Sequence, residues 1–298
     1  MFRRLRRRLE ATYERLLEQE LSTTPDHVAV IQDGNRRYAR ERNCEAATGH
    51  RAGAETTESV LRWCNELGIR ELTLYAFSTE NFDRPAAERR ALFELIDRKL
   101  REFAEQDRVH DEAVQIRAIG ETDRLPEHLR EAIEYAERKT AGYDSLRLNV
   151  ALAYGGRAEL LEVTREIATA AANGEIDPSS VDTAEIEQRL TDSPTRAVDL
   201  VVRTGGDERT SNFLPWHANG NEAAVYFCTP YWPEFSRIDF LRALRTYELR
   251  EASRQAVRKK RAATLVRLLS EGRDPERSMA VRHATQRRST EPTEADGD

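Results

Sequence analysis

The sequence predicts an α/β fold: a single domain with a central, mostly parallel six-stranded sheet flanked by helices on both faces. Two observations lead to this prediction. Short runs of aliphatic and β-branched residues alternate with longer segments of helical periodicity, and no repeat or low-complexity linker divides the body of the chain. Parallel strands that are buried on both faces require such crossover helices between them.

Six short segments have the composition of buried strands. They lie at residues 27–31, 71–77, 114–119, 147–152, 199–202 and 223–227. Helical periodicity marks the segments 50–67, 86–106, 127–140, 157–172, 183–190 and 237–268. Gly68 suits the position just past a helix end, where a left-handed backbone is common. In a sheet of this kind, ligands bind beyond the carboxyl ends of the strands.

The two ends of the chain differ from its body, which we place at residues 25–270. Residues 1–24 contain an amphipathic segment whose first two turns are crowded with arginine. This segment is either a helix on the protein surface or a basic interfacial helix that touches anionic lipid at the inner face of the membrane, and the sequence leaves both open. Residues 271–298 are charged and end without large apolar side chains, so we expect a disordered tail.

The composition excludes several classes of protein. The 53 acidic residues outnumber the 47 basic ones and give a net charge of −6, which argues against a dedicated nucleic-acid binder. No apolar run approaches the roughly 20 residues that cross a bilayer, and no signal peptide is visible, so we expect a cytoplasmic protein. The three cysteines are isolated and fit buried free thiols. The histidines show no zinc pattern, so any metal would have oxygen ligands, which favours Mg²⁺.

Four polar clusters each follow a predicted strand, as a ligand site at one edge of the sheet requires. In the first, HVAVIQDGNRRY, Asp33 ends a buried strand and Gly34 and Asn35 open a helix. Free backbone N–H groups at a helix start favour anions, and the carboxylate offers a hard oxygen ligand for Mg²⁺. Taken alone, Asp-Gly-Asn is also an ordinary turn.

The other three clusters repeat this arrangement. In LYAFSTENFDRP an apolar strand runs into Ser78 and Asn81, and a capping turn explains the serine and the proline but not the asparagine. In DLVVRTGGDERTSNF, arginines, paired glycines and a serine follow a strand and form a second candidate anion site. In NVALAYGGR a strand passes through glycines into a helix.

These strings resemble the cis-prenyltransferase family, typified by undecaprenyl diphosphate synthase, over roughly residues 26–250. HVAVIQDGNRRYA, GHRAG, LTLYAFSTENFDRP, LNVALAYGGR and DLVVRTGGDERTSNFLPW occur in order, followed by Glu222 and YWPEF. The trans-prenyltransferases use DDxxD motifs, and this chain has no adjacent pair of aspartates. The resemblance implies the cis-prenyltransferase fold, with residues 25–270 as catalytic domain. It also implies a homodimeric, Mg²⁺-dependent enzyme that condenses isopentenyl diphosphate onto an allylic prenyl diphosphate.

The resemblance further implies roles for individual residues. Asp33 would be the principal Mg²⁺ ligand, with Glu222 as a second carboxylate near the metal. The allylic diphosphate would be held by Gly34, Asn35, Arg36, Arg37, His50 and Arg84. The isopentenyl diphosphate would be held by Arg203, Arg209, Thr210 and Ser211. Asn81 would accept or relay the proton, Ser78, Thr79 and Glu80 would line the site beside it, and Tyr38 and Phe82 would flank the prenyl chain.

The implied product is a long-chain Z-polyprenyl diphosphate, such as the undecaprenyl precursor of a glycosyl carrier lipid. The acidic, lysine-poor composition and the string GNRRYA are most similar to archaeal members, for which geranylgeranyl diphosphate is the expected primer and farnesyl diphosphate the other candidate. The growing tail needs an apolar tunnel, which we place between the helices at 86–106 and 127–140 and the sheet. Product length should then depend on side-chain bulk at its far end.

The chain departs from the family pattern at four places. Gln32 replaces a methionine, Ala46 replaces a diphosphate-binding arginine of bacterial members, residues 218–221 are unusually polar, and Ala252 replaces the glycine of an Arg-x-Gly element. Two other interpretations are possible. A non-catalytic partner subunit of the same family would lack the metal aspartate and substrate arginines, which this chain retains. An unrelated phosphate-binding hydrolase would carry a GxSxG or GxxxxGK string, and neither occurs.

Overall fold

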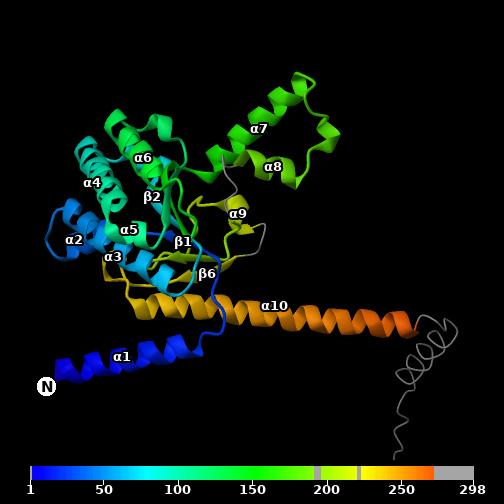
Figure 1. Cartoon of the computed structure of the whole chain (residues 1–298), viewed down its shortest axis with the longest axis horizontal. Coiled ribbons are helices and arrows are strands. Elements are labelled where there is room, and N and C mark those ends of the chain that lie inside the picture. The colour runs from blue at the N-terminus through cyan, green and yellow to red at the C-terminus, as the bar shows by residue number, and fades with distance from the viewer. Residues whose placement is uncertain (1, 191–195, 220–222, 272–298) are drawn as a thin grey trace, which may run out of the picture. The chain divides into compact units, whose positions relative to one another are not determined.

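The computed structural model describes residues 2–190, 196–219 and 223–271 (Figure 1). The chain divides into two compact units, residues 1–248 and 249–298. Within the second unit, the described residues continue a helix that begins in the first. The sequence-based division at residues 25 and 271 stays a prediction, and the tail expected from residue 272 onward lies outside the described residues.

The first unit contains a six-stranded sheet in the order β3-β4-β2-β1-β5-β6, and every strand pair in it is parallel. The strands are β1 (His27–Ile31), β2 (Glu71–Ser78), β3 (Val114–Ile119), β4 (Leu146–Tyr154), β5 (Leu200–Arg203) and β6 (Ala224–Phe227). All six predicted strands are therefore confirmed, with ends displaced by at most two residues. Asp199 stands just before β5, and its carboxylate accepts the backbone N–H groups of Asp26 and His27, at 2.9 and 3.0 Å.

Helices link the strands at nearly all the predicted positions. They are α1 (Phe2–Glu20), α2 (Asn35–Glu41), α3 (Ala46–Glu66), α4 (Ala86–Glu105), α5 (Asp107–Asp111), α6 (Glu127–Thr140), α7 (Gly156–Ala172), α8 (Thr183–Leu190), α9 (Pro215–Asn219) and α10 (Arg237–Glu271). Gly68 has a φ of 72° after the end of α3, as its predicted capping position requires. The five-residue helices α5 and α9 are too short to show helical periodicity in the sequence.

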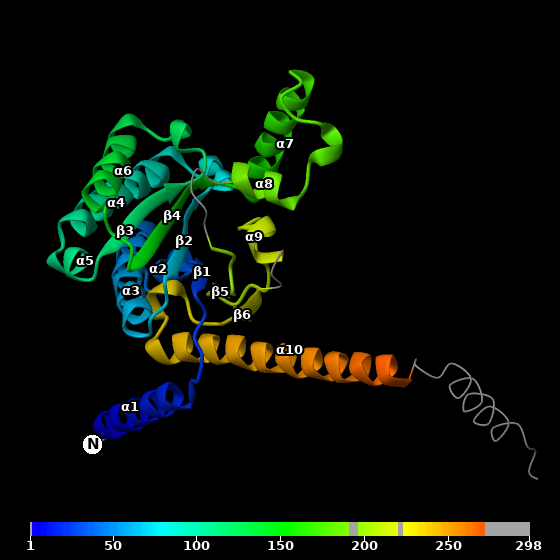
Figure 2. The ribbon, with the colours of Figure 1, turned by 45° about the vertical axis from the view of Figure 1, so that its right-hand side comes forward.

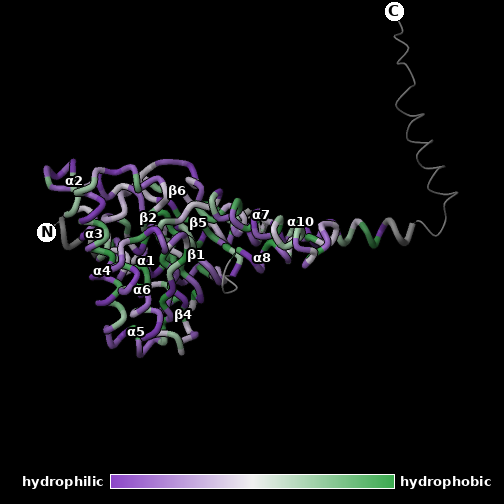
Figure 3. The backbone as a smooth tube through the Cα atoms, turned by 90° about the horizontal axis from the view of Figure 1, so that it is seen from above, coloured by the Kyte–Doolittle hydropathy of each residue, from purple (hydrophilic) through white to green (hydrophobic). Residues whose placement is uncertain are grey.

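The helices form layers on either side of the sheet. Figure 2 shows α3, α4, α5 and α6 on one side and α7, α8 and α9 on the other. The larger apolar core fills the first side and includes the start of α10, whereas a smaller core around Phe213 and Leu214 lies apart from it. Hydrophilic and hydrophobic residues are interleaved along the described chain, as expected for elements that each bury one face (Figure 3).

The strand β1 is the centre of the sheet and fixes where the polar loops meet. All five of its residues are buried, and it pairs with β2 on one side and β5 on the other. Ile31 is in register with Arg203 at the end of β5. Because the strands are parallel, the loops that follow β1, β2 and β5 emerge at the same edge of the sheet.

The helix α1 packs against the start of α10 through charged residues. Arg237 contacts Glu14 and Glu18 of α1 and also Glu66 of α3. Leu17 is buried, whereas Leu9 and Leu16 are 62% and 49% exposed. Among the described residues, no helix has the length and apolar character needed to cross a bilayer.

The expectation of three buried thiols is wrong at one position. Cys64 and Cys228 are buried, but Cys44 is exposed. Cys44 lies in the loop between α2 and α3, directly after Asn43, whose φ is 52°. A residue in such a surface turn has no apolar layer to cover it.

Candidate active site

The loop after β1 is held in one conformation by its neighbours. Gly34 has a φ of 101°, and a Cβ at this position would lie 2.6 Å from Cδ1 of Tyr231, so only glycine fits. The Gly34 N–H donates to Oδ1 of Asp33 at 2.6 Å. The hydroxyl of Thr204 donates to the backbone oxygen of Asp33 at 2.7 Å. The carboxylate of Asp33 is thereby fixed at the sheet edge.

Two arginines surround the Asp33 carboxylate. The Nη2 group of Arg203 donates to Oδ2 at 2.7 Å, and Nη2 of Arg37 lies 3.2 Å from Oδ1. Burial alone would raise the pKa of Asp33, but the hydrogen bond from Arg203 and the charges of Arg203 and Arg37 hold this pKa below its usual value. Asp33 is therefore ionised at neutral pH. Asp207, which the sequence analysis did not single out, lies 3.3 Å from Arg203.

Arg203 also organises the loop after β5. Its side chain is 3% exposed, and its Nη1 group donates to the Arg209 backbone oxygen at 2.7 Å and to the Ser211 hydroxyl at 2.5 Å. Ser211 and Asn212 have φ values of 49° and 61°, which are strained for side-chain-bearing residues. The backbone oxygen of Asn212 accepts the Gly156 N–H at the start of α7, at 2.9 Å, and stabilises this conformation.

A second cationic group gathers around Glu88, a residue that the sequence analysis missed. Arg84 Nη1 lies 3.0 Å from Oε1 of Glu88, His50 Nε2 lies 3.9 Å from the same oxygen, and Arg36 Nη1 lies 3.7 Å from Oε2. The signal that could have found Glu88 is its spacing of four residues from Arg84, which stands just before α4 and reaches the first turn of that helix. Three predicted ligands of one diphosphate thus converge on a single carboxylate.

The neutral form of His50 is favoured in this cluster. Burial and the positive charge of Arg84 lower the pKa of His50 to about 4, and the Glu88 carboxylate only partly opposes them. His50 is therefore neutral at pH 7. Its Nε2 atom has no hydrogen-bond partner among the described residues, although it is buried.

The loop after β2 places Asn81 and Ser78 beside each other. The side-chain oxygen of Asn81 accepts the Ser78 N–H at 3.2 Å, and the Ser78 side chain accepts the N–H of Asn81 in return. The prediction that a capping turn does not explain Asn81 is therefore wrong. Asn81 caps the turn reciprocally, and this pairing fixes its amide group at the edge of a cavity.

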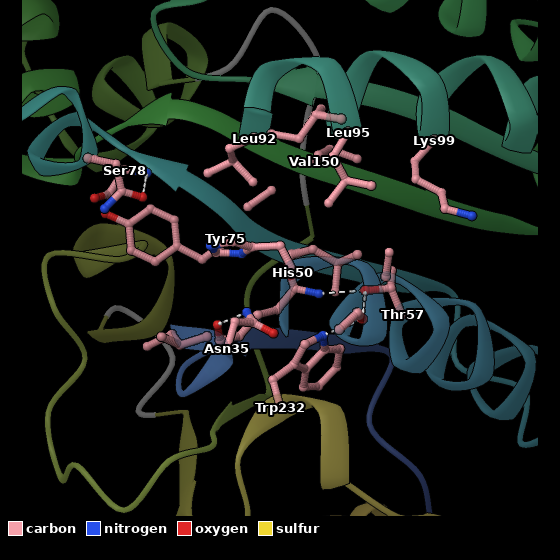
Figure 4. A pocket seen from close by; sticks show the side chains of 18 of the residues that line it. Asn35, His50, Thr57, Tyr75, Ser78, Leu92, Leu95, Lys99, Val150 and Trp232 are labelled. Atoms are coloured by element: carbon pink, nitrogen blue, oxygen red, sulfur yellow. Dashed lines mark hydrogen bonds between the residues drawn. The ribbon is translucent and has the colours of Figure 1, made fainter. Parts of the chain in front are cut away.

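This cavity has a volume of about 270 Å³ and joins the polar edge to an apolar interior (Figure 4). Asp33, Asn35, His50, Ser78, Asn81 and Arg84 line its polar end. Leu92, Leu95, Ile96 and Leu100 of α4, and Leu148 and Val150 of β4, line the remainder. Asn35 and Trp232 lie on the side opposite α4 in Figure 4.

The tunnel was predicted between the helices at 86–106 and 127–140 and the sheet, and this placement is wrong in one element. The wall opposite α4 comes from α3 through Gly53, Ala54 and Thr57, while α6 contributes no lining residue. Leu129 and Ile133 of α6 are buried in close packing. The small residues of α3 leave room that α6 does not.

The remaining predicted residues lie at varying distances from the cavity. The Cζ atom of Arg42 lies over the ring of Tyr38, 3.8 Å from the ring centre. Phe82 packs on Phe77, with ring centres 5.0 Å apart. Neither Tyr38 nor Phe82 lines the cavity. Thr79, Glu80 and Thr210 do not line it either, and Arg209 is 67% exposed beside Asp207. Glu222 lies outside the described residues.

The donor set at the sheet edge fits a magnesium ion better than a transition metal. Among the described residues no three His, Cys, Asp or Glu side chains converge as a metal site. Asp33 and Asp207 instead offer two carboxylates, both within 4 Å of Arg37. Mg²⁺ is typically bound in this way, through one or two carboxylates together with substrate phosphates and water.

Three buried polar atoms at this edge have no hydrogen-bond partner among the described residues. They are Nε2 of His50, the side-chain oxygen of Asn35 and Nε of Arg203. Nδ1 of His217 and Nε of Arg237 share this property away from the edge. Of the three atoms at the edge, Nε of Arg203 and the ring nitrogen of His50 can donate to a diphosphate oxygen, whereas the Asn35 oxygen can only accept. The edge can therefore hold polyanions while the adjoining cavity takes an apolar tail.

Comparison with known proteins agrees with this arrangement. Residues 31–255 match the prenyltransferase family described as "Putative undecaprenyl diphosphate synthase". The chain is similar to tritrans,polycis-undecaprenyl-diphosphate synthases (geranylgeranyl-diphosphate specific) of two haloarchaea. The Haloarcula marismortui protein is 62% identical over 89% of this chain and 87% of its own, and the Halobacterium salinarum protein is 64% identical over 87% and 86%.

A solved structure shares the fold. Lavandulyl diphosphate synthase from Lavandula x intermedia, in complex with dimethylallyl diphosphate, is 33% identical with a TM-score of 0.67, and the match covers 75% of this chain and 95% of that one. The sheet order, the convergent arginines beside Asp33 and the apolar cavity are thus found in a chain whose sequence matches one family over most of its length. The protein belongs to the undecaprenyl diphosphate synthase family of prenyltransferases.

Proposed function

We propose that the protein adds isopentenyl diphosphate units repeatedly to geranylgeranyl diphosphate and releases a Z-polyprenyl diphosphate of undecaprenyl length. The observation that carries this proposal is the junction of Asp33, Arg203 and His50 with an apolar cavity at the sheet edge. A diphosphate head and a prenyl tail require these two environments side by side. The primer and product follow from the names of the haloarchaeal relatives.

The allylic diphosphate occupies the side of the edge where Arg36, Arg84 and His50 surround Glu88. The N–H groups at the start of α2, after Gly34, and the guanidinium of Arg37 complete this side. The isopentenyl diphosphate occupies the other side, held by Arg203 and by Arg209, Thr210 and Ser211 in the strained loop. Several guanidinium groups are needed to balance two diphosphates, because each diphosphate carries multiple negative charges.

Asp33 and Asp207 would hold Mg²⁺ together with diphosphate oxygens, and Glu222 is a further carboxylate for it. The ion, when bound, neutralises charge that develops on the diphosphate leaving group. The site residues then serve to align the two substrates. The isopentenyl double bond attacks the allylic carbon as the allylic C–O bond breaks, diphosphate leaves, and a proton is lost to form the Z double bond. Asn81, fixed by Ser78, stands at the cavity edge as the relay for that proton.

Two further properties belong to this proposal. A homodimer is expected from the family resemblance, and sedimentation equilibrium tests it. Contact of α1 with anionic membranes is supported by the exposed Leu9 and Leu16 and by the exposed Arg6 and Arg8 on the same helix. Co-sedimentation with vesicles that contain or lack anionic lipid tests this contact.

One experiment tests the reaction. The purified protein is incubated with labelled isopentenyl diphosphate, Mg²⁺ and a primer of ten, fifteen or twenty carbons, and the products are sized. We expect long products, made best from the twenty-carbon primer. Asp33→Ala should reduce turnover at least a thousandfold (about 4 kcal/mol in transition-state free energy) because the central carboxylate is lost. Retained turnover would refute this catalytic assignment. An inactive wild type that only binds a second subunit would instead favour the partner-subunit interpretation.

A further inference from the structure

The loop after β5 has a strained backbone that depends on contacts with its neighbours. Ser211, Asn212 and Leu214 have φ values of 49°, 61° and 47°, in the left-handed region that is costly for residues with side chains. Asn212 is held by the start of α7, because its backbone oxygen accepts the Gly156 N–H at 2.9 Å and its Oδ1 accepts the Arg157 N–H at 2.8 Å. Asparagine also adopts this region more readily than serine. The conformation of Ser211 therefore needs support of its own.

Tyr75 of β2 supplies contacts at this point. Its hydroxyl lies 3.5 Å from the backbone oxygen of Ser211 and 3.2 Å from that of Tyr154 at the end of β4, and it can donate to either. Burial raises the pKa of Tyr75, so the hydroxyl keeps its hydrogen. The ring of Tyr75 stacks on that of Phe213, with ring centres 4.4 Å apart and planes 9° from parallel. One side chain thus supports the strained loop through its hydroxyl and its ring.

The ring of Tyr75 is also part of the wall of the apolar cavity. It extends towards Ser78 at the polar end (Figure 4). Tyr75 is held within the sheet, in register with Ile31 of β1 and Ala151 of β4. It therefore stands between the cavity that would take the allylic tail and the loop that would hold the isopentenyl diphosphate. The family resemblance assigned no role to Tyr75.

The direction of the Ser211 hydroxyl depends on this backbone conformation. Nη1 of Arg203 donates to the hydroxyl oxygen at 2.5 Å. A guanidinium group cannot accept a hydrogen bond, so the hydrogen of the Ser211 hydroxyl points away from Arg203 and can donate to a diphosphate oxygen. A change of the backbone at Ser211 would turn the hydroxyl away from Arg203 and separate two groups that bind the same anion.

We propose that Tyr75 is a positioning residue, which keeps Ser211 in the left-handed conformation in which Ser211 and Arg203 bind isopentenyl diphosphate together. This inference rests on the proposed function and deepens it. Tyr75 acts through Ser211 and does not itself bind the diphosphate. Loss of the Tyr75 hydroxyl therefore weakens the binding of isopentenyl diphosphate and leaves the primer diphosphate, on the other side of the edge, unaffected.

The test uses Tyr75→Phe, which removes the hydroxyl and keeps the ring in the cavity wall. We expect the KM for isopentenyl diphosphate to rise about tenfold, as for the loss of one hydrogen bond, while kcat and the KM for geranylgeranyl diphosphate change less than about twofold. Ser211→Ala should raise the same KM. Tyr75→Phe should add nothing to it in the double variant, because both changes act at one hydroxyl.

Tyr143→Phe is the matched control. It also removes a hydrogen-bonded tyrosine hydroxyl, which lies 2.8 Å from Nδ1 of His110, and Tyr143 is not among the described residues that line the cavity. This control should leave both KM values unchanged. Thermal denaturation checks that each variant is folded, which we expect because phenylalanine preserves the ring packing.

Calorimetric titration with isopentenyl diphosphate and Mg²⁺, without primer, tests the inference independently of turnover. We expect Tyr75→Phe to bind about tenfold more weakly than the wild type. Unchanged affinity and KM for isopentenyl diphosphate would overturn the inference. An equal loss for the primer, or an effect that adds fully to that of Ser211→Ala, would overturn it too. If the wild type binds isopentenyl diphosphate but makes no polyprenyl product, the proposed function fails, and the titration still decides the role of Tyr75.

Discussion

At the scale of single residues, acidic and basic side chains of the site pair with each other in the absence of a diphosphate. Glu88 is the clearest case, because one carboxylate contacts Arg36, Arg84 and His50. A diphosphate that binds these three groups must compete with Glu88. The carboxylate therefore keeps the cationic groups aligned and, at the same time, weakens the binding of anions.

The variant Glu88→Gln tests this competition. We expect it to bind inorganic pyrophosphate about tenfold more tightly, because a neutral amide no longer repels the anion. Because the diphosphate product is then released more slowly, we also expect kcat to fall. Isothermal titration with pyrophosphate measures the affinity, with Glu94→Gln, an exposed change on the same helix, as control. Weaker binding by Glu88→Gln would show that alignment of the arginines dominates instead.

His50 predicts a linkage between proton uptake and diphosphate binding. Its pKa of about 4 in the free protein means that it is neutral at pH 7. A bound diphosphate favours the charged imidazolium and raises this pKa, so binding takes up protons and becomes tighter as pH falls toward 5. Calorimetry in buffers of different ionisation enthalpy measures the uptake. His50→Gln should reduce it and exposed His128→Gln should not, and equal uptake in all three proteins would contradict the assignment.

At the scale of elements, the strands could be predicted from the sequence more accurately than the packing partners of the helices. Each strand is a short apolar run followed by a polar cluster, so its type and its end could be recognised. The parallel topology then placed Asp33 and Arg203 at one edge, which the 2.7 Å contact between their side chains agrees with. The tunnel wall was assigned to α6 instead of α3, because helical periodicity identifies a buried face but not the helix on which it packs.

Close approach of α3 to the Asp33 loop depends on Gly53. A Cβ at this position would lie 2.3 Å from Oδ1 of Asn35 and 2.8 Å from Cδ1 of Trp232. Gly53→Ala must therefore displace the side chains of Asn35, at the start of α2, and of Trp232. We expect a loss of about 1–3 kcal/mol in unfolding free energy and at least a tenfold loss in kcat/KM. Gly142→Ala, where nothing lies within 4 Å of the added carbon, is the matched control in denaturation and activity assays and should change neither.

At the scale of the whole molecule, a partly buried carboxyl group makes stability depend on pH. Glu159 of α7 accepts a hydrogen bond from the Tyr154 hydroxyl at 2.6 Å, and burial raises the pKa of Glu159 to about 7. Its protonated form stabilises the folded state. This contribution is complete below the unfolded pKa near 4.5 and is lost as pH rises through 7.

Glu159→Gln imitates the protonated form at every pH. At pH 8 we expect it to be more stable than the wild type by about 2 kcal/mol, or by about 5 °C in Tm, and at pH 5 to be nearly equal. Thermal denaturation at the two pH values measures this, with the exposed Glu162→Gln as control. A stability difference that does not change with pH would contradict the role of ionisation.

The position of β1 between β2 and β5 has a consequence for synthesis on the ribosome. The pair of Asp33 and Arg203 closes a loop of 170 residues, and β1 gains its second neighbour only when β5 and the segment after it have emerged. Until then one edge of this buried strand is open to other nascent chains. The protein cannot bind its anionic substrates before about two-thirds of it has been translated, and we expect its folding to be slow for its size.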